Sequence, residues 1–271
     1  MPELPEVETV KNEIAPHIEG RRITGVSLPW EGMVKEPSVE EFLSRVSGQD
    51  ITGITRRGKY LSVALSSGDY LIIHLKMTGA LIVIKKGEEL PKYTRAIIHL
   101  DNDTDIAFRD PRKFGVLRVV DDNEKIIGKL GPEPFDADFT PEVLGKILDK
   151  RRTPMKALLC EQHLIAGIGS MYADESLFAI KVHPERPGDK ISGKEVKKLY
   201  EAIREILYAA IENKGASVDT YYRPDGSTGT AHYEFKVAHR FKEPCLVCGT
   251  PIERIKVRGR GSYFCPKCQP K

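Results

Sequence analysis

The chain has 271 residues, of which 40% are hydrophobic and 30% are charged, so it is long enough to bury a core and to form two domains. No run of about 18 apolar residues occurs, which argues against a membrane-spanning helix. The N-terminal segment MPELPEVETV carries glutamates where a secretion signal would carry a basic and then an apolar region. We therefore expect a globular protein that stays in the cytoplasm.

The first predicted element is a helix over residues 4–18. Apolar side chains recur at steps of three and four from Leu4 to Ile18, which places them on one face of a helix. Pro5 suits the first turn of such a helix.

The pattern changes to short β-type runs between residues 51 and 120. These runs, such as YLSVAL and YLIIHL, are separated by turn sequences such as SSGD and DNDTD, a spacing typical of an antiparallel sandwich or barrel. Residues 131–139 are rich in Pro, Gly and Asp and lack periodicity, which indicates a linker. The sequence thus predicts a first domain over residues 1–130 and a linker over 131–139.

A helical domain is predicted over residues 140–235. Helical periodicity covers residues 141–150, 153–164, 170–180 and 192–213. The polar, glycine-rich stretch that follows, up to residue 235, is longer than most structural connections, so we expect it to be a functional loop.

The tail, residues 236–271, combines positive charge with a cysteine pattern. It holds nine Lys and Arg against two acids, which favours a polyanionic partner. Sixteen residues separate the pair Cys245 and Cys248 from the pair Cys265 and Cys268, which is zinc-ribbon spacing. Disulfides are disfavoured without a secretion signal, and a redox pair is disfavoured because there are two CxxC motifs. We expect one structural zinc ion, with Cys160 left as an ordinary buried thiol.

Several motifs resemble those of the formamidopyrimidine-DNA glycosylases and their relative endonuclease VIII. They occur in that family's order along nearly the whole chain: MPELPEVETV, HLKMTGAL (74–81), DPRKFG (110–115), LGPEPF (130–135), AGIGSMYADESLF (166–178) and RGRGSYFCPKCQ. The resemblance implies a multidomain α+β fold, with an N-terminal β-sandwich and leading helix, a helix–two-turn–helix domain and a zinc hairpin. It implies a monomeric enzyme that binds double-stranded DNA with oxidised bases or abasic sites.

The resemblance implies that Pro2 is the nucleophile once Met1 has been removed. A terminal amine has a pKa of about 7.7–8.0, against about 10.4 for lysine, so a larger share of it is neutral at pH 7. A secondary amine that attacks C1′ of the sugar gives an iminium with no N–H to lose, which can accept electrons during strand cleavage. Without the resemblance, Pro2 would be read as a residue that starts a helix.

The resemblance also assigns roles to the other catalytic candidates. Glu3 would transfer protons as the sugar opens, and Lys59 would contact phosphate and assist β-elimination, although by composition alone Lys59 is a solvated strand lysine. Arg260 would serve δ-elimination, and as a guanidinium it suits a phosphate clamp better than a proton donor. Glu6 is either a second, organising carboxylate or only a complement to the helix dipole.

Bulky side chains that fill the hole left by an everted nucleotide are expected at Met77, Arg112 and Phe114. Met77 and Phe114 could instead be core residues, but each lies in a glycine-flanked turn segment. Further DNA contacts implied by the resemblance are assigned to His74, Tyr93, Arg151, Lys156 and Ser170.

Three departures from the family pattern bear on specificity. Ser170 stands where asparagine is usual, Tyr93 stands where a histidine is common, and the predicted lesion-capping loop, residues 217–235, carries GTAHYEF. The main hypothesis is a bifunctional glycosylase and AP lyase for oxidised purines. The alternatives are an endonuclease VIII-like enzyme for oxidised pyrimidines, disfavoured by the PELPEV start, and a non-catalytic DNA binder, which would not need Pro2, Glu3 and Lys59.

Overall fold

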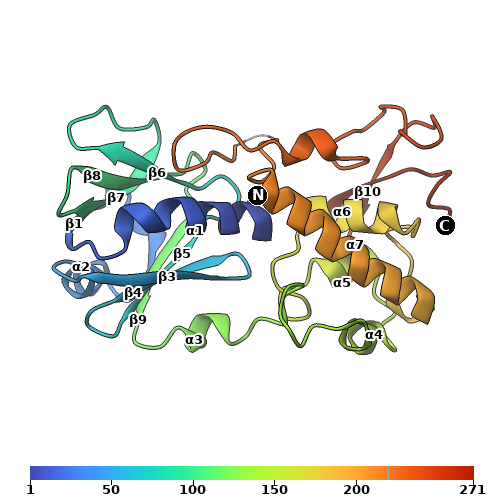
Figure 1. Ribbon diagram of the computed structural model, residues 1–271, viewed down its shortest axis with the longest axis horizontal. Coiled ribbons are helices and arrows are strands. Elements are labelled where there is room, and N and C mark those ends of the chain that lie inside the picture. The colour runs from blue at the N-terminus through green and yellow to red at the C-terminus, as the bar shows by residue number, and fades with distance from the viewer. Residues whose placement is uncertain (219) are drawn as a thin grey trace. The chain divides into compact units, whose positions relative to one another are not determined.

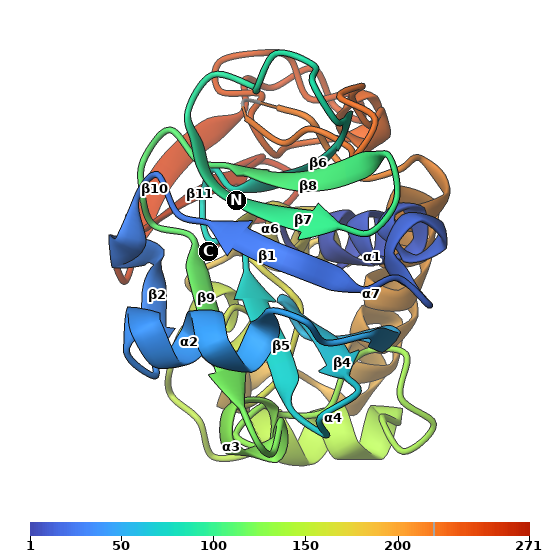
Figure 2. The same cartoon turned by 90° about the vertical axis from the view of Figure 1, so that its left-hand side faces the viewer.

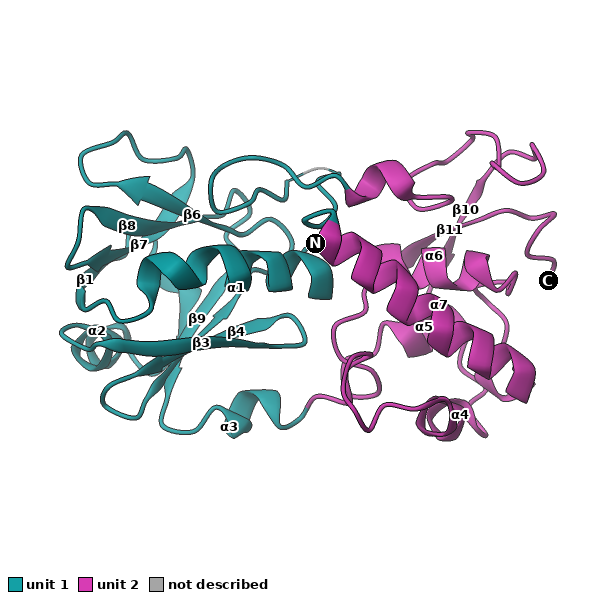
Figure 3. Cartoon of the chain, in the orientation of Figure 1, with its two compact units in different colours: residues 1–129, 213–230 teal, residues 130–212, 231–271 magenta. Residues whose placement is uncertain are grey.

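The computed structural model describes residues 1–218 and 220–271, and the chain divides into two compact units. Unit 1 comprises Met1–Lys129 and Asn213–Thr230, and unit 2 comprises Leu130–Glu212 and Ala231–Lys271, as Figure 3 shows. The predicted capping loop includes residue 219, which lies outside the described residues.

Two sheets form the β-sandwich of unit 1, which confirms the predicted fold (Figure 2). One has the strand order β1-β7-β8-β6 and the other β2-β9-β5-β4-β3, in which β2 and β9 pair in parallel and the other neighbouring strands pair antiparallel. The strands are β1 (Ile23–Ser27), β2 (Val34–Glu36), β3 (Ile51–Arg57), β4 (Tyr60–Leu65), β5 (Tyr70–His74), β6 (Ala80–Lys85), β7 (Thr94–Leu100), β8 (Thr104–Arg109) and β9 (Val116–Val120).

Helix α1 (Leu4–Ile18) has the bounds predicted from its apolar stripe (Figure 1). The apolar residues from Val7 to Ile18 lie in one core cluster with side chains from both sheets. The helix packs this apolar face against the sheets and leaves its polar face to solvent. No elements were predicted between residues 19 and 50, where the structure has β1, β2, a 3-10 turn η1 (Glu31–Met33) and α2 (Val39–Val46). Helix α2 begins at Ser38, whose hydroxyl accepts the Glu41 N–H, and a short α3 (Glu124–Ile127) ends this part of unit 1.

The second part of unit 1, residues 213–230, is called the return segment here. The predicted helical domain over residues 140–235 included these residues, whereas the structure groups them with unit 1. Tyr221 is only 5% exposed within the sandwich core cluster, and the Val83 N–H donates to the Pro224 carbonyl at 2.8 Å. Contacts of this kind join residues more than a hundred positions apart, so no local pattern predicts them.

Unit 2 contains the helices and the C-terminal hairpin. The helices are α4 (Pro141–Leu148), α5 (Met155–Leu159), α6 (Ser170–Ala179) and α7 (Gly193–Glu212), with 3-10 turns η2 (Gly188–Lys190) and η3 (Ala231–Glu234). Strands β10 (Glu253–Val257) and β11 (Arg260–Phe264) pair in an antiparallel hairpin. Helix α5 is shorter than the predicted 153–164. Among the described residues, no helix is long and apolar enough to cross a membrane.

Gly215 should be more sensitive to substitution than other glycines with positive φ. Its φ is +78°, and a Cβ there would lie 2.9 Å from Glu6 Cγ, whereas Gly226 (φ +82°) has open space at that position. Gly226→Ala should lose about 1 kcal/mol from backbone strain, and Gly215→Ala about 1–2 kcal/mol more from the added clash. Urea unfolding of both variants measures the difference, and equal losses would contradict the close packing.

Candidate functional site

The first turn of α1 brings two buried carboxylates next to Pro2. Pro2 is buried, while Met1 before it is 48% exposed. Glu3 is 1% exposed and is the N-cap of α1, and its backbone N–H donates to Glu6 Oε2 at 2.8 Å. The Glu6 side chain thus accepts from one of the backbone N–H groups at the helix start that have no partner within the helix.

Glu6 also binds the return segment. Its second oxygen, Oε1, accepts the Ala216 N–H at 2.8 Å, and the Tyr221 hydroxyl lies 3.4 Å from the Glu6 carbonyl oxygen. The side chain is 0% exposed. Of the two roles weighed for Glu6, this geometry favours the organising one, because each carboxylate oxygen receives a backbone N–H from a different part of unit 1.

Lys59 and His74 lie in neighbouring strands or their turns. Lys59 follows Gly58 in the turn between β3 and β4 and is only 5% exposed, unlike the solvated lysine that composition suggests. The His74 ring contacts the cross-strand neighbour Tyr60 edge-on, with ring centroids 4.5 Å apart.

The His74 imidazole is neutral at physiological pH. Burial, with smaller contributions from the positive charges of Lys76 and Lys59, lowers the pKa of His74 to about 3. Nδ1 accepts the Lys76 N–H at 2.9 Å, so the ring proton is on Nε2. His74 can therefore donate one hydrogen bond from Nε2 without carrying charge.

The turn that holds Lys59 is tied to α1 by an ion pair that the sequence did not reveal. Arg56 Nε donates to Glu8 Oε2 at 2.6 Å, and Arg56 Nη1 donates to the Gly58 carbonyl at 3.0 Å. Burial alone would raise the pKa of Glu8, but hydrogen bonds from Lys11 and Arg56 hold it below its usual range. Glu8 and Arg56 are 48 positions apart, so only the fold brings them together.

Met77, Arg112 and Phe114 form an exposed cluster. Met77 is 42% exposed and Phe114 48%, so the core alternative considered for both is not what the structure shows. Arg112 Nη1 lies 3.4 Å from Met77 Sδ, and the guanidinium lies over the Phe114 ring at 4.7 Å. The structure thus brings together the three side chains predicted to act together.

The buried carboxylate of Asp110 shapes the loop that carries this cluster. Its Oδ2 accepts the N–H groups of Phe114 and Gly115, each at 2.7 Å, while Oδ1 accepts the Arg112 N–H at 3.2 Å and the Thr78 hydroxyl. Asp110 is 1% exposed. The DPRKFG motif contains this residue, but no pattern in the sequence indicates that it organises the loop.

Tyr93, one of the departures from the family pattern, is surrounded by positive charge. It is 42% exposed, and Lys92, Arg95 and Arg109 each lie 5.3–5.8 Å from its ring centroid. Arg109 also lies over Tyr222 of the return segment at 5.0 Å. Lys92 is exposed, whereas Arg95 and Arg109 are half-buried. Positive charge around an exposed aromatic ring suits contact with a polyanion.

In unit 2, Lys156 and Ser170 make contacts within the protein. Lys156 is 0% exposed, and its Nζ lies 2.5 Å from Asp174 Oδ1 and donates to the Ser170 carbonyl at 2.5 Å. The Ser170 hydroxyl donates to the Gly261 carbonyl of the hairpin at 3.0 Å. This geometry favours a structural role for Lys156 and Ser170 over the direct phosphate contacts that the resemblance implies.

Two exposed arginines in unit 2 were predicted to contact DNA. Arg151 is exposed, and its Nε donates to the Ile147 carbonyl at 2.7 Å. Arg260 is exposed at the first position of β11, directly after a tight turn in which Arg258 and Gly259 have positive φ. Pro2, Glu3 and Lys59 belong to unit 1 and Arg260 to unit 2.

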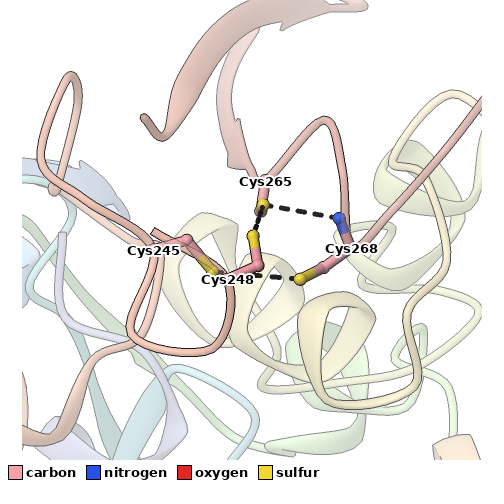
Figure 4. Close-up of side chains that lie close together, drawn as sticks. All are labelled: Cys245, Cys248, Cys265 and Cys268. Carbon is pink, nitrogen blue, oxygen red and sulfur yellow. Dashed lines mark hydrogen bonds between the residues drawn. The ribbon is translucent and has the colours of Figure 1, made fainter. Parts of the chain in front are cut away.

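The four predicted zinc ligands come together at the base of the hairpin (Figure 4). All four sulfur atoms lie within 4.8 Å of one another, with Cys245 Sγ 3.9 Å from Cys268 Sγ and Cys248 Sγ 3.4 Å from Cys265 Sγ. These separations are too long for disulfides. They match the edge of about 3.8 Å expected for a ZnS4 tetrahedron with Zn–S bonds of about 2.3 Å. One structural zinc ion fits this site.

Comparisons with known proteins match the same family in each part of the chain. Family models match residues 1–117 (formamidopyrimidine-DNA glycosylase N-terminal domain), 130–222 (formamidopyrimidine-DNA glycosylase H2TH domain) and 242–271 (zinc finger found in FPG and IleRS). The formamidopyrimidine-DNA glycosylase of Chloroflexus aurantiacus is 43% identical, with 99% of this chain and 98% of that protein covered. The one from Desulforamulus reducens is 41% identical, with 99% of each covered.

A solved structure shares the fold along the full length. A Lactococcus lactis FPG mutant in complex with Fapy-dG-containing DNA matches with a TM-score of 0.93 and 35% identity, and the match covers 100% of both chains.

Asp110→Asn should loosen the loop of the exposed cluster. The amide offers one acceptor oxygen and turns an NH2 group toward backbone N–H groups, so two or more of the four hydrogen bonds are lost. We expect about 2–4 kcal/mol lower stability and faster amide exchange at Phe114 and Gly115. The control Asp121→Asn, at an exposed carboxylate, should change neither quantity. Unchanged exchange at Phe114 in Asp110→Asn would contradict the role of Asp110.

Zinc removal should unfold the hairpin. Cys248→Ser should hold less than one zinc per chain and lose amide protection in β10 and β11, because the metal supplies the folding free energy of so small a module. Cys160→Ser, which changes a buried cysteine outside the cluster, should keep its zinc. Metal analysis and hydrogen exchange measure both, and full zinc content in Cys248→Ser would rule out the assigned ligand set.

Proposed function

Because the chain belongs to the formamidopyrimidine-DNA glycosylase family, we propose that it excises oxidised purines from double-stranded DNA and then cleaves the strand as an AP lyase. The observation that carries this proposal in the structure is Pro2, directly before a helix whose first turn holds the buried carboxylates Glu3 and Glu6. Full-length relatives named formamidopyrimidine-DNA glycosylase support this function over the endonuclease VIII alternative.

Pro2 acts as the nucleophile in this proposal. The lone pair of its amine forms a bond to C1′ while the bond from C1′ to the base breaks, and the base leaves with the electron pair. The amine loses its N–H proton and the departing base gains one, so the protons balance. Ring opening gives the iminium, which withdraws electrons as a proton leaves C2′ and the 3′ phosphate departs in β-elimination. A second elimination releases the 5′ phosphate. A terminal amine supports this chemistry near pH 7 because its pKa is lower than that of lysine.

Glu3 and Glu6, both at the start of α1, have different roles in this proposal. Glu3 lies next to Pro2 in the chain and transfers protons to and from the opening sugar. Glu6 holds the Glu3 backbone and the return segment through its two carboxylate oxygens. The same carboxylate therefore links the nucleophile's helix to the return segment, at the residue directly before the predicted lesion-capping loop.

The remaining side chains of unit 1 bind the DNA. Lys59 contacts phosphate, and the neutral His74 donates a hydrogen bond from Nε2. The exposed cluster of Met77, Arg112 and Phe114 enters the duplex and fills the space left by the everted nucleotide.

Tyr93, Arg151 and Arg260 complete the proposed DNA contacts. Tyr93 contacts the DNA from a surface on which three cations surround its ring. The exposed Arg151 binds backbone phosphate. Arg260 clamps the phosphate that is lost in δ-elimination, because a guanidinium binds phosphate in bidentate fashion. Zinc stabilises the hairpin that carries Arg260 and supplies no reaction step. A cytoplasmic location, with the protein associated with the nucleoid through its DNA substrate, is part of this proposal.

Borohydride trapping tests the nucleophile. The protein is incubated with duplexes that carry 8-oxoguanine, a formamidopyrimidine or thymine glycol, and borohydride should reduce the iminium to a stable covalent adduct with the two purine lesions. An added N-terminal residue that acylates Pro2 should abolish the adduct, while replacement of the exposed Pro270 by Ala should not. An adduct that persists with blocked Pro2 overturns the nucleophile, and preferential trapping by thymine glycol moves the enzyme to the endonuclease VIII branch.

A further inference from the structure

Helix α6 holds the free edge of β11 through two side chains. The Ser170 hydroxyl donates to the Gly261 carbonyl at 3.0 Å, and the Tyr263 N–H donates to Asp174 Oδ2 at 3.1 Å. Ser170 and Asp174 are four residues apart and share a helix face, while Gly261 and Tyr263 are two apart and present these groups on the same strand edge. The other edge of β11 pairs with β10. Both edges of β11 therefore have hydrogen-bond partners.

A buried lysine fixes the two helix residues that make these contacts. Lys156 Nζ lies 2.5 Å from Asp174 Oδ1 and donates to the Ser170 carbonyl at 2.5 Å. The Lys156 and Asp174 side chains are 0% and 1% exposed. A buried ion pair is a poor source of stability, because desolvation of both charges offsets their attraction. Its presence here is better explained by the geometry it imposes on α6 and β11.

The chain that leads to the hairpin is bound to the same helix. Glu175, the residue after Asp174, accepts the N–H groups of Lys236, Val237 and Ala238 at 2.8–2.9 Å. Helix α6 thus contacts the C-terminal segment of unit 2 at two places, first at residues 236–238 before the hairpin and then along β11.

Arg260 depends on this backbone for its position. It directly precedes Gly261, its side chain is exposed, and within the described residues its guanidinium makes no hydrogen bond or ion pair. The backbone at Gly261 therefore determines the position of the Arg260 Cα, from which the guanidinium side chain extends. A bidentate phosphate contact requires such a fixed starting point, because a displaced fork loses one of its two hydrogen bonds.

We propose that Lys156, Asp174 and Ser170 form a latch that positions Arg260 for its phosphate contact. These three are positioning residues, and Lys156 and Ser170 affect DNA binding through the hairpin instead of through phosphate contacts of their own. The inference rests on the phosphate role proposed for Arg260.

A double-mutant cycle in the zinc-loaded full-length protein tests the latch. Affinity for a duplex with a non-cleavable abasic-site analogue is measured at several salt concentrations for Ser170→Ala, Arg260→Ala and the double variant. Ser170→Ala should weaken binding about three- to tenfold, as expected for the loss of one hydrogen bond. It should also lower the salt slope by up to about one, as the loss of one phosphate contact does. The double variant should bind no more weakly than Arg260→Ala.

Two further variants define the controls for that cycle. Ser170→Thr keeps the hydroxyl and should restore binding. Ser176→Ala removes a buried hydroxyl of the same helix that donates to the Tyr172 carbonyl at 2.7 Å, and it should bind like the wild type. Additive losses in the cycle, with a salt slope that Ser170→Ala leaves unchanged, would mean that Ser170 contacts DNA itself and would overturn the proposal.

A DNA-free measurement separates the latch from the function of Arg260. Lys156→Met combined with Asp174→Leu replaces the ion pair by apolar side chains, which should preserve stability and zinc content. The Tyr263 amide should nevertheless exchange at least tenfold faster, because its acceptor is gone. Unchanged exchange at Tyr263 would overturn the latch. If Arg260→Ala alone left affinity and salt slope unchanged, the phosphate role would fail, and with it the functional purpose of the latch, even where exchange at Tyr263 confirmed the contact.

Discussion

The buried carboxylate of Glu6 is the interaction on which the arrangement of unit 1 depends. One oxygen accepts the N–H of Glu3 at the start of α1, and the other accepts the N–H of Ala216 in the return segment. An unpaired carboxylate at a fully buried position would cost several kcal/mol, so both donors must stay in place. The residue at position 215 must then be glycine, because its φ is positive and a Cβ would collide with Glu6.

The same physical device recurs in both units. Asp110 accepts three backbone N–H groups and shapes the loop that exposes Arg112 and Phe114. Glu175 accepts three N–H groups at the approach to the hairpin, and Asp174 accepts one from β11. In each case the carboxyl oxygens of a buried acid accept backbone N–H groups and so hold the backbone in place. The exposed cations nearby remain available for an anionic ligand, as phosphate recognition requires.

The departures from the family pattern change contacts within the protein as well as its surface. Ser170 stands where asparagine is usual, and its hydroxyl donates a hydrogen bond to the Gly261 carbonyl of the zinc hairpin. Tyr93 replaces a common histidine with a neutral ring among three cations, and Arg109 connects it to Tyr222. Through Arg109, the second change links Tyr93 to Tyr222, which lies in the predicted lesion-capping loop.

Sequence alone was sufficient wherever the determining contacts are local or follow a fixed spacing. The stripe from Leu4 to Ile18 predicted α1 with its observed bounds, and the spacing of the four cysteines predicted the cluster at Cys245 and its partners. The motif around Arg112 indicated an exposed turn, which the structure has. These features need only helical periodicity, tetrahedral ligand geometry or turn chemistry.

Tertiary structure decided what depends on distant partners. Burial of Lys59, the pairing of Arg56 with Glu8, the hold of Glu6 on residues 215–216 and the enclosure of Lys156 by Asp174 and Ser170 all join residues that no periodicity relates. A charged side chain reads as solvated in a sequence, because its partner and its burial are properties of the folded core. The identities of the charged residues were therefore available from the sequence, whereas their division into exposed groups, to which DNA contacts are assigned as proposals, and buried organising groups came only from the fold.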